Sequence, residues 1–106
     1  MVAEIQREVR DTDLSPARAS ELLMRLTALT GNCSAEIRER DMEFAAVYLQ
    51  CLETEGKANR AKIVAETTPA YHKKREARDT KELVEQMIGS LKYYLRTLES
   101  EMRLAR

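Results

Sequence analysis

The side chains best suited to binding a ligand are the lysines and arginines that gather in one part of this sequence. Residues 57 to 78 hold seven Lys/Arg and two Asp/Glu, a net charge of +5. Ammonium and guanidinium groups bind phosphate, and arginine can do so through two parallel hydrogen bonds. Two rings in the same stretch could stack on a nucleotide base. The predicted anion or nucleic-acid site therefore consists of Lys57, Arg60, Lys62, Tyr71, His72, Lys73, Lys74, Arg75 and Arg78.

Acidic residues elsewhere in the chain offset this basic segment. Residues 1 to 56 hold six Lys/Arg against eleven Asp/Glu, residues 79 to 106 hold five of each, and the formal net charge is zero. A neutral chain argues against a protein that coats nucleic acid over its whole surface. Two interpretations of the basic segment stay open: it contacts a phosphate-bearing ligand, or it is a solvated face that an acidic face of another subunit could neutralise.

Residues for catalysis or metal binding are scarce. His72 is the single histidine and lies next to Lys73 and Lys74, so we expect a solvated surface side chain rather than a catalytic group. The chain has no Cys-x-x-Cys, no His-Glu-x-x-His and no glycine-rich phosphate loop, the patterns typical of zinc and nucleotide sites. We therefore expect a protein that is not an enzyme and that holds no metal and no cofactor.

Composition predicts an all-α fold, because glycine and proline number only three and two and strong helix formers abound. We expect one domain over residues 1-106, with helices at 2-10, 16-30, 34-66 and 69-104. Ser15-Pro16 and Thr68-Pro69 are typical helix starts, and Gly31 could end the second helix in the left-handed conformation.

The third and the last helix each have an alternative start, and the third helix contains an unfavourable glycine. Asn32 or Ser34 could cap the third helix. Gly56 lies inside that helix at a cost of about 1 kcal/mol relative to alanine, which predicts a bend or a close backbone contact there. The last helix could instead begin anew at Asp79, with Glu82 completing a capping box.

Apolar residues form two stripes that predict a long antiparallel helical hairpin bent near residues 66 to 69. This bend would bring the basic residues between positions 57 and 62 close to those between positions 73 and 78. We also expect residues 37 to 52 to face residues 84 to 98. The first stripe is Ile37, Phe44, Cys51, Ala58 and Ala65; the second is Val84, Met87, Ile88, Leu91, Tyr94, Leu95, Leu98, Met102 and Ala105.

The hairpin would leave apolar flanks uncovered, so we expect a homodimer or higher homo-oligomer that completes a bundle. No apolar run approaches the roughly 20 residues that cross a bilayer, and the N-terminus is too charged for a secretory signal. These features predict a cytoplasmic protein. Cys33 and Cys51 would lie about 27 Å apart along a helix, so we expect two reduced thiols.

The chain from Ala45 onward, with its A-x-x-A helix, the T-P-A-Y bend and the ending 91-LKYYLRTLESEMRLAR-106, resembles short all-helical accessory proteins encoded by tailed bacteriophages. The resemblance implies a small accessory protein, located in the host cytoplasm if it is phage-encoded, from a group in which some members act in recombination or in countering host defence, and it transfers no binding residue. Its partner would be nucleic acid, a nucleotide, or a host or phage protein. In the last case the chain would be a protein-interaction module, an inhibitor or adaptor with no nucleic-acid role.

Overall fold

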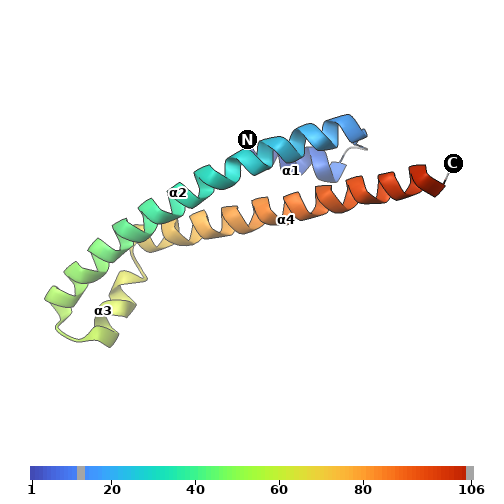
Figure 1. Cartoon of the computed structure of the whole chain (residues 1–106). Helices are drawn as coiled ribbons and strands as arrows, with labels where there is room; N and C mark the ends of the chain where they lie inside the picture. Colours follow the sequence, from blue (N-terminus) through green and yellow to red (C-terminus); the bar gives the residue numbers. More distant parts are fainter. Residues whose placement is uncertain (12–13, 105–106) are drawn as a thin grey trace. The chain divides into compact units, whose positions relative to one another are not determined.

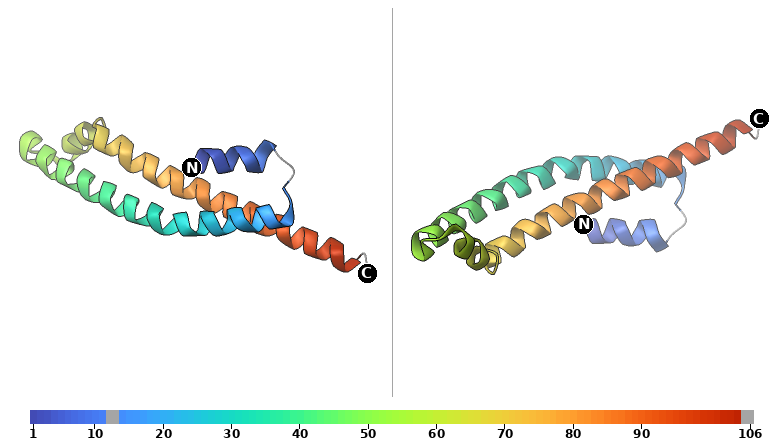
Figure 2. Two further views of the ribbon diagram at one scale, coloured as in Figure 1. Left: turned by 90° about the horizontal axis from the view of Figure 1, so that it is seen from above. Right: turned by 90° about the horizontal axis from the view of Figure 1, so that it is seen from below.

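The computed structural model describes residues 1–11 and 14–104, which form four α-helices and, within these ranges, no strand (Figure 1). They are α1 (Val2–Asp11), α2 (Pro16–Glu55), α3 (Ala58–Ala65) and α4 (Pro69–Leu104). The long helices α2 and α4 run antiparallel, and α3 lies in the connection between them (Figures 1 and 2). The predicted all-α hairpin is therefore confirmed. Ala105, the last member of the predicted second stripe, lies outside the described residues.

Both predicted proline starts are confirmed. Pro16 is the first residue of α2, and the Ser15 hydroxyl oxygen accepts a hydrogen bond of 3.1 Å from the Arg18 backbone N–H, which satisfies one donor of the first turn. Pro69 is the first residue of α4, where its missing N–H costs nothing. Since α4 continues without interruption to Leu104, the alternative start at Asp79 is wrong.

The predicted helix end at Gly31 is wrong. Residues 16 to 55 form one helix of 40 residues, and Asn32 and Ser34 lie inside it rather than capping a new helix. A single interior glycine costs about 1 kcal/mol, which packing on either side can offset. Leu26 is buried before Gly31 and Ile37 is half-buried after it, so α2 has contacts to lose on both sides of the glycine.

Gly56 ends α2 instead. Its φ of +72° lies in the left-handed region that favours glycine. The bend expected at this position is confirmed, but the close contact is not, because a Cβ added here would meet nothing within 4 Å. The predicted continuous helix over 34-66 is wrong, and so is its continuous stripe. After the break Ala58 is exposed, whereas Ala65 is buried in the separate helix α3.

The chain forms two compact units, each containing part of α2 and part of α4. The first unit combines Met1–Gly31 with Glu82–Arg106, and the second is Asn32–Lys81. The expectation that residues 37 to 52 face residues 84 to 98 is wrong, because Asp41 binds Arg78 and Phe44 contacts Lys74 and Tyr71. The first unit has the larger apolar core, formed by Ile5, Ala19, Leu22, Leu26, Val84, Met87 and Leu91.

Helix α1 is held to its unit by polar contacts as well as by the buried Ile5. The Arg18 guanidinium binds the Glu8 carboxylate through two nitrogens, at 2.5 and 2.7 Å. This hydrogen bond is the main cause that lowers the pKa of Glu8. The Tyr94 hydroxyl donates a hydrogen bond to the Leu14 carbonyl in the connection after α1. The first unit thus joins three helices.

Candidate nucleic-acid interface

All nine residues of the predicted site lie in the second unit. Lys57 directly precedes α3, Arg60 and Lys62 lie on α3, and the other six lie in the first turns of α4. The surroundings of these residues differ along the segment.

The cations at α3 face water. Lys57, Arg60 and Lys62 are exposed, and none forms an ion pair with a described residue. Helix α3 contains no acidic residue, and it buries its opposite side through Ala61 and Ala65. Helix α3 and the residue before it therefore present three positive charges that no carboxylate of the second unit neutralises by direct contact.

Two cations of α4 contact α2 instead. The Lys74 ammonium lies 4.6 Å from the centroid of the Phe44 ring, a cation–π contact. The Arg78 guanidinium binds one carboxylate oxygen of Asp41 at 2.7 Å, while the other oxygen, Oδ1, is buried and bonds no described residue. Lys74 and Arg78 thus join the packing of the unit, which leaves them less available to an external ligand.

The aromatic side chains of the site are also partly engaged. Tyr71 is half-buried, and its ring centroid lies 5.6 Å from that of Phe44. The Arg75 guanidinium lies 5.9 Å from the same Tyr71 ring. His72 is exposed, 6.1 Å from Tyr71 between ring centroids. Of the two rings proposed for base stacking, His72 is the accessible one.

A signal for the inward position of Lys74 exists in the sequence, although the sequence interpretation missed it. Positions 70, 74, 77, 81 and 84 continue the α4 stripe toward the N-terminus with alternating steps of four and three. Lys74 lies on this series beside the buried Ala77 and Val84. Its partner Phe44 and the Arg78 partner Asp41 were not assigned to the site, because a sequence does not show which helix faces meet.

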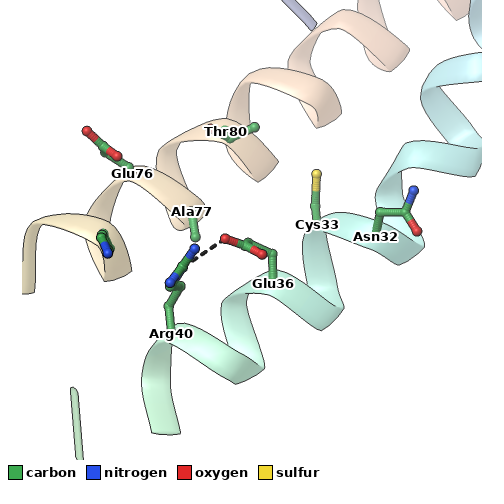
Figure 3. A pocket seen from close by; sticks show the side chains of 8 residues that line it. Asn32, Cys33, Glu36, Arg40, Glu76, Ala77 and Thr80 are labelled. Atoms are coloured by element: carbon green, nitrogen blue, oxygen red, sulfur yellow. Dashed lines mark hydrogen bonds and ion pairs between the residues drawn. The ribbon is translucent and has the colours of Figure 1, made fainter. Parts of the chain in front are cut away.

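A pocket of about 490 Å³ opens between α2 and α4 within the second unit (Figure 3). The Arg40 guanidinium binds the carboxylates of Glu43 at 3.0 Å and Glu36 at 2.8 Å. These two hydrogen bonds raise the pKa of Arg40, and the one to Glu43 has the larger effect. In Figure 3 the Glu36 carboxylate points to Arg40, and the Cys33 thiol points into the space between the helices. The full lining is Asn32, Cys33, Glu36, Arg40, Lys73, Glu76, Ala77 and Thr80.

The pocket does not suit a polyanion. Two of its lining side chains carry a positive charge and two a negative charge, so their formal charges cancel. A smaller pocket of about 250 Å³ lies beside Cys51, where Glu55 is the only carboxylate in the lining.

Both cysteines are free thiols, as predicted. Within residues 1–11 and 14–104, no three His, Cys, Asp or Glu side chains are grouped so that they could hold a metal ion.

No helix in the described part of the chain is both long and apolar enough to span a membrane. The chain matches no protein-family model, no curated protein and no solved structure. Its function must therefore be inferred from the geometry of the exposed side chains.

Proposed function

We propose that this protein is not an enzyme and that it binds nucleic acid through the basic surface around α3. We define this α3 surface as Lys57, Arg60 and Lys62, with the exposed His72 and Lys73 of α4 as further contacts. The observation that carries the proposal is the absence of any carboxylate paired with the three α3 cations in the described structure. Unpaired surface cations gain most from phosphates, because binding releases the counterions condensed on the polymer.

Several arginines elsewhere in the protein have carboxylate partners. Arg18, Arg25, Arg40 and Arg103 each bind at least one glutamate, and most of these partners lie three or four residues away on the same helix. Pairs of this kind keep a charged helix solvated and add little stability. Arg38 and Arg96 also form no ion pair with a described residue, but the α3 surface groups three unpaired cations within residues 57 to 62 with no acidic residue among them, which supports a role in binding rather than only in solubility.

Fluorescence anisotropy with labelled single- and double-stranded oligonucleotides, at about 50 mM salt, tests the proposal. The triple variant Lys57→Ala, Arg60→Ala, Lys62→Ala should bind at least roughly tenfold more weakly than the unmodified protein. The matched control is Arg7→Ala, Lys92→Ala, Arg96→Ala, which removes three exposed positive charges from the first unit and should keep the affinity. If the unmodified protein binds no oligonucleotide, the proposal is wrong.

A protein partner is the second candidate function, because the α3 surface is not purely basic. Directly after the α3 cation Lys62, Ile63 is 66% exposed and Val64 is 38% exposed. Exposed apolar side chains with flanking charges are typical of protein interfaces. In this case a pull-down from lysate should recover one stoichiometric protein after nuclease treatment, and Ile63→Ser should abolish its recovery. We also propose that a phage or prophage encodes this protein.

A further inference from the structure

The outer face of α2 in the second unit is apolar and uncovered. Met42 is 70% exposed and Leu49 is 61% exposed, and Ala45 and Ala46 between them are exposed as well. At 100° per residue these four side chains lie on the side of the helix opposite Phe44, which is half-buried against α4. In the described structure no other element covers this side of α2.

The spacing of this face is symmetric. Intervals of four, three, one, three and four residues separate six exposed positions about a midpoint between Ala45 and Ala46. The six are Arg38, Met42, Ala45, Ala46, Leu49 and Glu53. The two end residues carry opposite charges, and neither forms an ion pair with a described residue. A helix face that keeps its spacing but reverses its charge when turned end for end is complementary to itself.

We propose that this face of α2 packs antiparallel against the same face of a second copy of the chain, with the two-fold axis between Ala45 and Ala46. Met42 then meets the partner's Leu49, and Arg38 reaches the partner's Glu53, about 11 Å along the helix from the axis. Each contact occurs twice, as a two-fold interface requires. The two alanines allow the helix backbones to approach closely where the axis passes.

Charge complementarity identifies the occupant and its direction. A parallel copy in register would place Arg38 against the partner's Arg38 and Glu53 against the partner's Glu53, and both contacts are repulsive. The antiparallel copy forms two attractive pairs from the same four charges. All six positions lie on one uninterrupted helix within the second unit, so the face needs no rearrangement before it pairs.

Analytical ultracentrifugation of the full chain, without any nucleic acid, tests this interface independently of the proposed function. The unmodified protein should show a monomer–dimer equilibrium between about 1 and 100 µM, the range of moderate affinity. Arg38→Glu and Glu53→Arg should each raise the dimer dissociation constant at least roughly tenfold, because both ion pairs become repulsive. The double variant should restore the dissociation constant to within about threefold. Arg96→Glu, an exposed reversal on α4, is the control and should have no effect.

A second variant tests close approach without changing charge. Ala46→Trp places a bulky side chain beside the proposed axis and should abolish the dimer, while circular dichroism should show unchanged helicity because position 46 is exposed. A protein that stays monomeric at all concentrations would overturn the proposal. A dimer that survives Ala46→Trp, or a double charge reversal that dissociates as readily as the single reversals, would also overturn it.

Discussion

Leu26 and Leu49 lie on the same helix, yet replacing them with alanine should have very different effects on stability. Leu26 is fully buried in the core of the first unit, with an exposed fraction of 0%, whereas Leu49 is 61% exposed. Leu→Ala at a buried position costs about 2 to 5 kcal/mol through lost transfer free energy and the cavity left behind. The same change at an exposed position costs no more than about 0.5 kcal/mol in the monomer. Both replacements change helix propensity equally, so the difference reports burial.

Urea unfolding followed by circular dichroism measures this difference. With a slope of about 1 to 3 kcal/mol per molar urea for a small protein and a cost of about 2 to 5 kcal/mol, Leu26→Ala should lower the unfolding midpoint by at least about 0.7 M. Leu49→Ala should leave the midpoint nearly unchanged at low protein concentration, where dimer is scarce. At high concentration it should lower the midpoint by mass action if Leu49 lies in the proposed interface. Equal losses from the two replacements at low concentration would refute the structural assignment of the core.

Three further predictions follow from individual contacts. The Arg18 hydrogen bond lowers the pKa of Glu8 below its ordinary value of 4.5, so the pair stabilises the fold above that pH, and its contribution is lost as the pH falls through the lowered pKa. The melting temperature should therefore fall less between pH 6 and pH 3 in Glu8→Gln than in the unmodified protein. Gly56→Ala should cost about 1 kcal/mol in urea unfolding, because a φ of +72° strains any residue with a Cβ. Lys74→Met keeps the apolar stem but removes the charge over Phe44 and should cost about 0.5 to 1 kcal/mol; no loss would show that the contact is incidental.

Sequence patterns predicted those parts of the fold that depend on local chemistry. Ser15-Pro16 and Thr68-Pro69 mark true helix starts, because the Ser15 side-chain cap and the two prolines each act within one turn. Gly31 and Gly56 could not be told apart in the same way. Both have the conformational freedom to end a helix, but only Gly56 adopts a positive φ, since packing on both sides carries α2 through Gly31.

The candidate site was predictable as a region and not in its details. The charge excess of residues 57 to 78 located the basic cluster in one unit. Which cations remain accessible depends on tertiary contacts. Lys74 is half-buried over Phe44 and Arg78 is paired with Asp41, whereas Lys57, Arg60 and Lys62 stay exposed and unpaired. The accessibility of the α4 cations depends on which faces of α2 and α4 meet. Neither the composition nor the periodicity of one helix determines its register against the other.

The salt dependence of oligonucleotide binding tests the central claim most directly. Each phosphate neutralised by a protein cation contributes about −0.9 to the slope of log affinity against log salt concentration for duplex DNA. If all three α3 cations contact phosphates, Lys57→Ala, Arg60→Ala, Lys62→Ala should make that slope shallower by about 2 to 3. The control variant Arg7→Ala, Lys92→Ala, Arg96→Ala should keep the slope of the unmodified protein. A slope that the α3 variant leaves unchanged, or that the control reduces equally, would contradict nucleic-acid binding at the α3 surface.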